Sequence, residues 1–501
     1  MTTLAPVWRT RLFTGTGVLL ALVAGYHVAQ GSLLWPAAMV AASLAVVASL
    51  MRTTRLQAWI LASLVAGYVV GNRGFAQLTL LPGLPLLPAE AGLIVLVGLQ
   101  VIQRATRGAA GYRVGGLEIL IVVWMVIGAV RFAFDFPRHG FFAARDFATV
   151  YYAAFFFLAQ NWVRRAPELK EVLLKTVRIS AVVLLFTHRL VELFPGFFFD
   201  VLQINGAPLI YYKADLVGMF LAMGAIVQYL RFEQKGGWYR PILAAAMVFE
   251  VINTDNRAAM LALVVGGGWL MLGRRWKLTA WVGTAAVLGV LGTLWVARIT
   301  NTPWQQTPLL GLYEKAISVV DPAGHRRYQG EDTFNKGANN QYRLVWWELV
   351  TRETWETNPV LGLGFGHDLA SEFMQTYYAN VSEDYNVRSP HSIIMTVFAR
   401  MGLVGLAAYL AIIVVITKRT WHVVHTEDRL ALPFWLSGWT ILVTACFGVV
   451  LEGPMGAVIF WLMLGTANGL STLPSAETAA PELTAVEPDD ASGATKAPAT
   501  P

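Results

Sequence analysis

The sequence predicts an all-α, polytopic membrane protein, and three observations lead to this prediction. Hydrophobic residues make up 56% of the 501 residues and charged residues only 14%, a composition that soluble domains of this length do not have. Apolar segments of about 17 to 25 residues, long enough to cross a hydrocarbon core, recur along the chain. These segments lack the polar and apolar alternation of outer-membrane strands, so we expect them to be helices.

Taken in order, the apolar segments number about fourteen, and we expect about 12 to 14 of them to be transmembrane helices. They are predicted at 12–28, 32–50, 57–71, 90–103, 115–134, 143–162, 172–190, 209–230, 241–254, 257–273, 278–297, 391–417, 431–450 and 454–471. One large polar stretch interrupts the series. The predicted organisation is therefore N-terminal helices (1–297), a large loop (298–390), C-terminal helices (391–471) and a tail (472–501).

Lys and Arg residues cluster in every second connection between these segments. Because basic residues mark the cytoplasmic side of a membrane protein, the alternation places both termini in the cytoplasm and the 298–390 loop outside it. The net charge of +7 is explained by these clusters and gives no reason to expect nucleic-acid binding. The tail is rich in Ala, Pro, Thr and acidic residues, and we expect it to be disordered.

Arg257 is the first candidate for substrate binding. The stretch Asn253-Thr254-Asp255-Asn256-Arg257 places it in the first turn of a predicted membrane helix, with Asp255 or Asn256 as the N-cap. Free amides, the positive end of the helix dipole and a guanidinium together suit a phosphate or pyrophosphate. The alternative, of equal weight, is an interfacial arginine that reaches to water.

His391 is the candidate for proton transfer. Ser389 is a plausible N-cap and Pro390 suits the first helical position, so we expect the imidazole on the opening turn of a helix. The helix dipole disfavours imidazolium there, and a neutral histidine can take a proton from a sugar hydroxyl. Without partners, such a histidine is more often a structural hydrogen-bonding residue.

The large loop contains an amphipathic pattern over 339–350, whose Leu344, Trp347 and Val350 would share one helical face. The glycine-rich stretch 358–366 follows it. No strand precedes this stretch and no Walker lysine follows it, so close backbone packing is favoured over nucleotide binding. The acidic residues of the loop show neither calcium-loop nor zinc spacing, so no metal site and no cofactor are expected.

Two further charged pairs lie at predicted helix ends outside the cytoplasm. Arg145 and Asp146 form either a local charge pair or part of a functional site. Lys213 and Asp215 follow two tyrosines at the head of a span, where they are costly in lipid. We therefore expect Lys213 and Asp215 to pair or to line a cavity.

Four stretches, in this order, resemble the O-antigen ligase and polymerase superfamily of bacterial envelope-polysaccharide enzymes. They are Asn256-Arg257-Ala258-Ala259, Tyr342-Arg343-Leu344-Val345-Trp346, the glycine-rich 358–366, and Pro390-His391-Ser392 with 401–406 after it. The resemblance covers about 208 to 415 in order and spacing. The chain has Asn256, Ser392 and Arg400 where the family usually has Ser, Asn and Glu.

The resemblance implies a GT-C-like glycosyltransferase of the bacterial inner membrane, with its reaction centre facing the periplasm. The donor would be a glycan on a polyprenyl (undecaprenyl) diphosphate. The acceptor would be a hydroxyl of a lipid-linked sugar, in the lipid A core or a growing polysaccharide, so that the protein acts in lipopolysaccharide or related biosynthesis. Neither a metal nor a nucleotide sugar would be needed.

The resemblance also implies roles for individual residues. His391 would act as general base in an inverting transfer, and Arg257 and Arg343 would stabilise the leaving diphosphate. The loop would cover the centre and present aromatic rings to the acceptor glycan. The further substrate-binding residues would be Arg145, Lys213, Asp215, Tyr342 and Trp346.

Several alternatives stay open at the level of sequence. Ligase-like transfer is slightly favoured over a repeat-unit polymerase, which shares the chemistry and differs in its acceptor, and transfer to a protein side chain is related. A polyprenyl-linked glycan transporter would use the same arginines without needing a base. A purely structural membrane protein would leave the arginines without a role.

Overall fold

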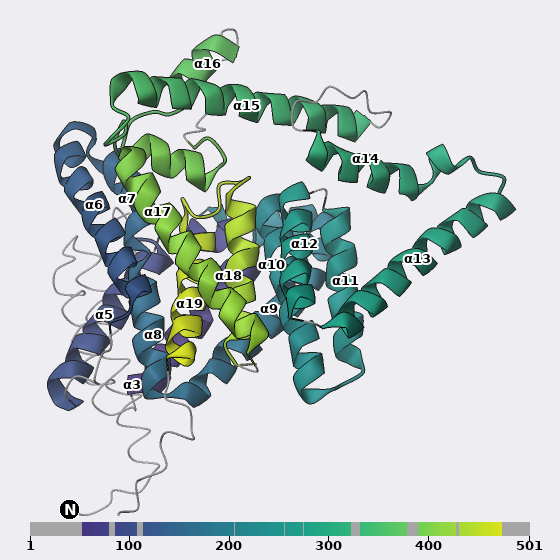
Figure 1. The fold of residues 1–501 in the computed structure, drawn as a ribbon, viewed down its shortest axis with the longest axis horizontal. Coiled ribbons are helices and arrows are strands. Elements are labelled where there is room, and N and C mark those ends of the chain that lie inside the picture. Colours follow the sequence, from purple (N-terminus) through teal and green to yellow (C-terminus); the bar gives the residue numbers. More distant parts are fainter. Residues whose placement is uncertain are drawn as a thin grey trace, which may run out of the picture.

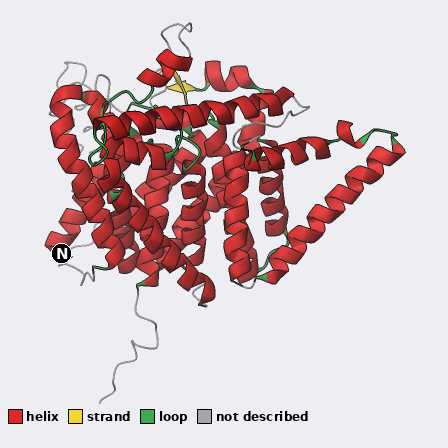
Figure 2. Ribbon diagram, turned by 45° about the horizontal axis from the view of Figure 1, so that its top comes forward, coloured by secondary structure: helices red, strands yellow, loops and turns green. Residues whose placement is uncertain are grey.

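The computed structural model describes residues 53–79, 86–107, 114–204, 206–254, 256–273, 275–321, 331–377, 389–426 and 430–472. Over these residues the chain is mostly helical, and its only sheet pairs the two short antiparallel strands β1 (Gln203–Ile204) and β2 (Ala207–Pro208), as Figure 2 shows. The predicted all-α class is confirmed. The predicted spans 12–28 and 32–50, and the tail beyond Thr472, lie outside the described residues.

Each predicted span that falls within the described residues is helical. The N-terminal helices are α3 (Thr53–Ala66) with the π-helix η1 (Gly67–Gly71), α4 (Arg73–Ala76), α5 (Pro88–Arg107), α6 (Gly116–His139), α7 (Phe141–Tyr151), α8 (Ala154–Arg165), α9 (Lys170–Leu193), α10 (Ala214–Lys235), α11 (Tyr239–Asn253), α12 (Arg257–Leu272) and α13 (Trp276–Ile299). The large loop contains α14 (Pro308–Val320), α15 (Glu331–Thr357) and α16 (Ser371–Tyr377). The C-terminal helices are α17 (Ile393–His425), α18 (Leu432–Ala445) and α19 (Pro454–Ser471).

Five helical segments among the described residues are long and apolar enough to cross a membrane. They are α6, the α7–α8 segment, α10, α17 and α19. Shorter apolar helices, including α12 and α18, lie among them. The protein is therefore a multi-pass membrane protein. Fewer helices than predicted are both long enough and apolar enough to count as spans. Helix α9 is one that does not qualify, because charged residues lie near both of its ends.

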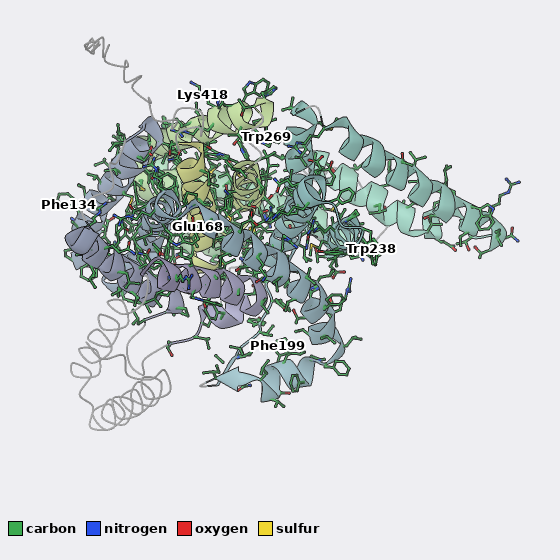
Figure 3. All side chains as sticks on the ribbon, turned by 90° about the horizontal axis from the view of Figure 1, so that it is seen from below. Phe134, Glu168, Phe199, Trp238, Trp269 and Lys418 are labelled. Atoms are coloured by element: carbon green, nitrogen blue, oxygen red, sulfur yellow. The ribbon has the colours of Figure 1, made fainter. Side chains whose placement is uncertain are left out.

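The helices α10, α12, α17 and α19 begin at the same end of the bundle, which Figure 1 draws at the top and which we call the upper end. Helix α15 lies across this end, and α13 and α14 form an arm beside the bundle. Seen from below in Figure 3, Phe134 of α6 lies at the rim, where its side chain is 72% exposed. An exposed apolar face on a helix that packs on its other side is expected where a helix faces lipid.

The centre of the bundle is closely packed. A Cβ on Gly465 of α19 would lie 2.2 Å from the backbone oxygen of Phe156 on α8, so these two helix backbones touch. Small residues allow such approach in membrane helices, where close packing contributes much of the association. Large rings fill the remaining space, among them the fully buried Trp124, Trp162, Trp435 and Trp461.

Helix α17 is bent at Gly402, whose φ of 62° only glycine adopts readily. The glycine-rich turn fills the bend: Leu363 N donates to Ala399 O (2.7 Å), and Leu403 N donates to Pro359 O (2.8 Å). The bend therefore leaves these backbone groups paired. The prediction that the turn serves close backbone packing is confirmed.

Of the three residues that the amphipathic pattern places on one face of the loop helix, only Val350 is fully buried. Trp346 and Val350 of α15 are fully buried against Phe373 and Ala399, whereas Leu344 is 39% exposed. The helix buries the stripe that carries the larger ring of Trp346, which stacks on Phe373 with ring centroids 4.9 Å apart. Burial of a large ring is worth more than burial of one leucine, and this sets the rotation of α15.

Candidate active site

His391 lies just outside α17, not on its first turn as predicted. The helix begins at Ile393, and Ser392 is its N-cap in an extended conformation. His391 itself has φ 55°, in the left-handed region that non-glycine residues rarely adopt. Backbone of this kind costs of order 1–3 kcal/mol and persists only where neighbouring structure enforces it.

Helix α15 holds His391 from one side. Trp347 Nε1 donates to Pro390 O (2.6 Å), which fixes the residue before His391. The rings of Trp346 and His391 lie with their centroids 5.8 Å apart. Trp346 is fixed in turn, because its Nε1 donates to Leu369 O (2.7 Å).

Glu452, in the connection between α18 and α19, holds His391 from the other side. Its Oε1 accepts hydrogen bonds from Ser389 Oγ (3.0 Å) and Thr396 Oγ1 (2.9 Å), two residues that flank His391 in the chain. Its Oε2 is buried and has no hydrogen-bond partner among the described residues. Burial raises the pKa of Glu452, although the two hydroxyls and Lys213 act against this. Sequence reasoning missed Glu452, which no motif marks.

Burial and the charges around His391 keep its imidazole neutral. Burial lowers the pKa of His391 to about 4, and the nearby positive charges of Arg343 and Lys213 act in the same direction, while Asp215 opposes them. Three predicted site residues are thus brought within electrostatic reach of His391. At neutral pH the ring is unprotonated and able to accept a proton.

Lys213 and Asp215 form an ion pair, as expected. Lys213 Nζ lies 2.9 Å from Asp215 Oδ2 and donates to Val449 O (2.9 Å), in the connection that also carries Glu452. Asp215 Oδ1 accepts from the amide of Leu216 (3.0 Å) in the first turn of α10. The ammonium is therefore anchored between α10 and the α18–α19 connection.

Asn72 fixes the backbone of Lys213. Its Oδ1 accepts from the amides of Arg73 (2.9 Å) and Lys213 (3.2 Å). The residue is fully buried, has φ 55°, and its Nδ2 has no partner within the part of the chain that the structure describes. Sequence reasoning missed Asn72, because its contact with Lys213 joins residues far apart in the chain.

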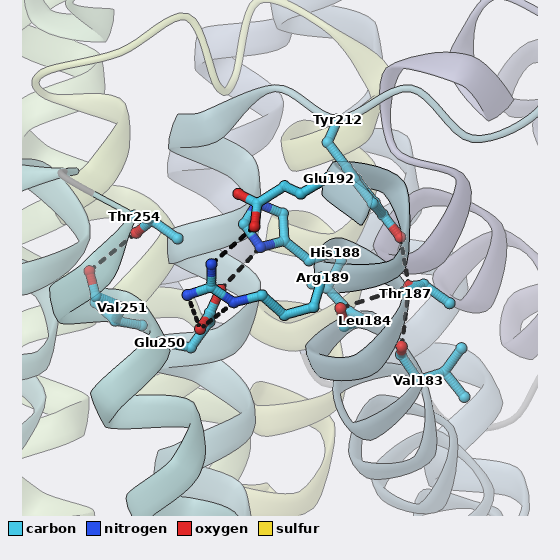
Figure 4. A network of polar contacts seen from close by, with 10 residues as sticks. All are labelled: Val183, Leu184, Thr187, His188, Arg189, Glu192, Tyr212, Glu250, Val251 and Thr254. Atoms are coloured by element: carbon cyan, nitrogen blue, oxygen red, sulfur yellow. Dashed lines mark hydrogen bonds and ion pairs between the residues drawn. The ribbon is translucent and has the colours of Figure 1, made fainter. Parts of the chain in front are cut away.

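A second polar cluster braces the same segment (Figure 4). Glu250 of α11 is only 3% exposed, and its carboxylate accepts from Arg189 Nη2 (2.6 Å) and contacts His188 Nδ1 (2.8 Å), both on α9. Thr187 Oγ1 and Tyr212 OH lie 2.5 Å apart. The cluster thus ties α9 and α11 together beside the residue that precedes Lys213.

Arg343 projects from α15 with a donor to spare. Its Nε is buried and has no hydrogen-bond partner among the described residues. Burial lowers the pKa of Arg343, while the negative charge of Asp215 opposes this shift. A buried guanidinium nitrogen without a partner can donate to an anionic ligand.

Arg257 is the first residue of α12, as predicted. Of the two candidate N-caps, Asn256 fills the position, and its Oδ1 accepts from Ala259 N (3.0 Å). A Cβ on Gly218 of α10 would lie 3.4 Å from the Cβ of Asn256, so the start of α12 packs about one turn below Asp215.

Arg145 lies beside a charged clamp formed by Asp146 and Arg400. Its Nε is 3.7 Å from Asp146 Oδ1, and its side chain is 46% exposed. Asp146 is held by Arg400, with Nη2 and Oδ2 2.8 Å apart, and also accepts from Gly366 N (3.0 Å). Asp146 therefore fixes the glycine-rich turn, and Arg145 borders that clamp.

Tyr342 and Trp346 form an aromatic group with Phe373, whose ring centroid lies 4.7 Å from that of Tyr342. Tyr342 is half-buried. The expectation that Trp346 offers an open face to a sugar needs correction, because its side chain is fully buried.

Fold and site together define a multi-pass membrane protein with cationic side chains and a neutral imidazole gathered at one end of the bundle. A model of the O-antigen ligase family matches residues 242–410, from α11 past the bend of α17. This match supports an O-antigen ligase or polymerase type of membrane enzyme, and it confirms the superfamily that the sequence motifs predict. It includes Arg257, Arg343 and His391. A search of curated proteins finds no significant match.

Proposed function

We propose that the protein is an inverting, metal-independent glycosyltransferase. It transfers a glycan from a polyprenyl diphosphate to a hydroxyl of a lipid-linked sugar acceptor, as an O-antigen ligase does. The observation that carries the proposal is the neutral imidazole of His391 beside the cationic Arg343 and Lys213. The basic clusters in alternate connections support a site on the periplasmic face of the inner membrane, with both termini in the cytoplasm.

In the proposed reaction, the acceptor hydroxyl donates a hydrogen bond to His391 and attacks the anomeric carbon of the donor. His391 takes the proton as the new glycosidic C–O bond forms. The bond between the anomeric carbon and the diphosphate oxygen breaks on the opposite face, and the diphosphate leaves with the electron pair. Configuration at the anomeric carbon is therefore inverted.

The growing negative charge on the leaving diphosphate needs stabilisation. Arg343 offers a fork of donors, including the buried unpartnered Nε, and Lys213 adds a compact charge. Arg257 adds its charge at the start of α12, where the helix dipole also favours an anion. Arg145 borders the glycine-rich turn and would reach only a more distant part of the donor.

Donor binding would also improve the base. A pKa of about 4 makes free His391 a weak proton acceptor. The negative charge of a bound diphosphate offsets Arg343 and Lys213, which are two of the groups that lower this pKa. The pKa of His391 therefore rises once the donor is in place, and the acceptor is activated only in the complex with both substrates.

The test uses purified protein in lipid nanodiscs with a polyprenyl-diphosphate-linked glycan and a glycolipid acceptor. We expect His391→Ala to lower the transfer rate by roughly 10²–10⁴-fold, the usual contribution of a general base. Donor binding, measured by calorimetry, should be retained. His425→Ala, an exposed histidine at the other end of α17, is the matched control. Unchanged glycan flux in His391→Ala would favour a transporter instead.

The cellular products distinguish ligase from polymerase. A strain that lacks a ligase accumulates polymerised carrier-linked chains and makes a lipid core without long polysaccharide. A strain that lacks a polymerase accumulates single repeat units. We favour ligase activity, as the description of the matching family does.

A further inference from the structure

Three arginines gather at the end of the bundle opposite the candidate active site, which we call the lower end. They are Arg178 in the first half of α9, Arg231 near the end of α10 and Arg240 near the start of α11. Arg240 lies close enough to Arg178 and to Arg231 for its charge to act on both. Like charges repel one another more strongly where water is partly excluded, so this arrangement is costly unless an anion joins it.

Arg231 is buried and keeps a donor open. It is only 5% exposed, and its Nε is buried without a hydrogen-bond partner among the described residues. Its Nη1 donates to Gln234 Oε1 (3.0 Å), and its Nη2 pairs with Glu171, a carboxylate that also lies 3.9 Å from Lys235. A basic residue that only anchors a helix extends its charge into water, which Arg231 does not do. Its burial therefore needs another explanation.

Arg178 and Arg240 bond to neutral groups. Arg178 Nε donates to the side chain of Gln228 (3.2 Å), which is buried on α10. Arg240 Nη1 donates to two carbonyls at the end of α10, including that of Arg231 (3.2 Å). Its Nε is buried and has no hydrogen-bond partner in the part of the chain that the structure describes. The three arginines therefore carry an excess of positive charge and two open donors.

The upper ends of α9 and α11 show how the protein joins these helices with an anion of its own. There Glu250 of α11 is buried, and its carboxylate lies 2.6 Å from Nη2 of Arg189 on α9 (Figure 4). At the lower end, neither Arg178 of α9 nor Arg240 of α11 is paired with a carboxylate of the described residues. An anion from outside the chain would complete the lower end in the same way.

The surroundings of the three arginines fit the phosphate of a lipid. Guanidinium groups match phosphate oxygens, which accept several hydrogen bonds at once. Trp238 and Tyr239, which precede Arg240 in the chain, are 78% and 42% exposed, and such aromatic side chains are typical of the level of lipid head groups. Further along α11, Ile242 and Phe249 are exposed, where acyl chains would lie beside the helix. A free phosphate ion would make no use of this apolar surface.

We propose that Arg178, Arg231 and Arg240 bind the phosphate of an anionic phospholipid, in the leaflet at the lower end of the bundle. The bound phosphate joins α9, α10 and α11 at this end, as Glu250 joins α9 and α11 at the upper end. This lipid site lies at the opposite end of α10 from Lys213, and it exists whether or not the protein transfers glycans.

The binding test titrates the full-length, delipidated protein in detergent with phosphatidylglycerol and, separately, with phosphatidylcholine. Native mass spectrometry measures the lipid that stays bound. We expect the wild type to prefer phosphatidylglycerol. Arg178→Gln and Arg231→Gln should each raise the Kd for phosphatidylglycerol roughly fivefold to tenfold, because each removes one cation near the phosphate.

Two further measurements separate specific binding from general charge and from misfolding. Lys418→Gln removes an exposed cation of α17, which Figure 3 shows apart from Trp238, and it should leave the Kd unchanged. In nanodiscs of phosphatidylcholine alone, Arg178→Gln should unfold no earlier than the wild type, because it removes one of three repelling charges. Adding phosphatidylglycerol should raise the unfolding temperature of the wild type more than that of Arg178→Gln.

Three results would overturn the proposal. The first is an equal Kd for phosphatidylglycerol in the wild type, Arg178→Gln and Arg231→Gln. The second is an equal loss of affinity in Lys418→Gln, which would indicate a general attraction of anionic lipids to the lower end. The third is displacement of phosphatidylglycerol by inorganic phosphate at a similar concentration, which would mean that the arginines bind a free ion rather than a lipid.

Discussion

Two arginines at the upper end of the bundle have opposite surroundings. Arg400 is buried on α17, and its guanidinium makes three polar contacts: Nη1 donates to the carbonyls of Gly364 (3.0 Å) and His367, and Nη2 pairs with Asp146 (2.8 Å). Arg343 on α15 keeps a buried Nε without a partner among the described residues. The same type of side chain thus completes a clamp in one region and leaves a donor open in the other.

This difference distinguishes an arginine that stabilises the fold from one that can bind a ligand. A buried charge that is fully paired stabilises one arrangement of the chain, and losing its partner is costly. A buried donor without a partner lowers stability and is retained where a ligand will pair with it. The clamp around Arg400 therefore holds the glycine-rich turn against α17, whereas Arg343 is available to the diphosphate of the proposed donor.

The largest expected effect is on stability at the clamp. Arg400→Ala removes the buried cation that pairs with Asp146 and bonds two carbonyls, so we expect it to lower the free energy of unfolding by about 3–5 kcal/mol. Thermal unfolding of the purified protein measures this loss. Arg343→Ala is the comparison, and it should unfold no earlier than the wild type. Equal destabilisation of both variants would contradict the contrast.

The next effect is on turnover at Arg343. Arg343→Ala should lower kcat by roughly 10²–10³-fold, the loss seen when one stabilising donor of a transition state is removed. Arg343→Lys keeps the charge but not the fork of donors, and should recover only part of the rate. Transfer assays with saturating donor and acceptor measure both variants. Normal turnover in Arg343→Ala would show that its open donor serves another purpose.

The sequence predicts well those features that are local. Apolar segments of spanning length predict the helices, and Asn256 before Arg257 predicts a helix start, because each depends on neighbouring residues. The sequence also led to Arg343, His391 and Lys213, and the structure brings Arg343 and Lys213 within electrostatic reach of His391. These residues are unusual in a largely apolar chain, so their types alone drew attention.

The supporting contacts could not be predicted in this way. Glu452 bonds to Ser389 from 63 positions along the chain, and Asn72 bonds to Lys213 from 141 positions away. Neither residue has a local pattern that distinguishes it from other connection residues. The same applies to His391, because its left-handed backbone depends on Trp347 and Glu452, which tertiary packing brings to it.

Substitutions of Glu452 test how His391 is held in position. Glu452→Ala leaves the hydroxyls of Ser389 and Thr396 without their acceptor, and we expect kcat to fall roughly tenfold or more, from a loss of about 1–3 kcal/mol. Glu452→Gln retains an acceptor oxygen for both, and should stay within a few-fold of wild type. The kcat of glycan transfer and the free energy of unfolding should both be measured for each variant. A loss in Glu452→Gln as large as in Glu452→Ala would mean that the carboxyl proton, rather than the hydrogen bonds, matters.

The smallest expected effect is a shift in the pH dependence of activity. It tests whether Arg343 and Lys213 lower the pKa of His391. His391 must be unprotonated to accept a proton, so activity is lost as pH falls through its pKa. In the free enzyme this pKa is lowered to about 4, by burial first and then by Arg343 and Lys213, so kcat/KM should hold until about pH 4. A bound diphosphate offsets both cations and raises the pKa, so the acid limb of kcat should lie at higher pH.

Profiles of kcat and kcat/KM against pH, for the wild type and for Lys213→Met, measure the effect. Removing one cation should move the acid limb of kcat/KM to higher pH. If the acid limbs of kcat and kcat/KM coincide in the wild type, the charge of the donor does not act on His391.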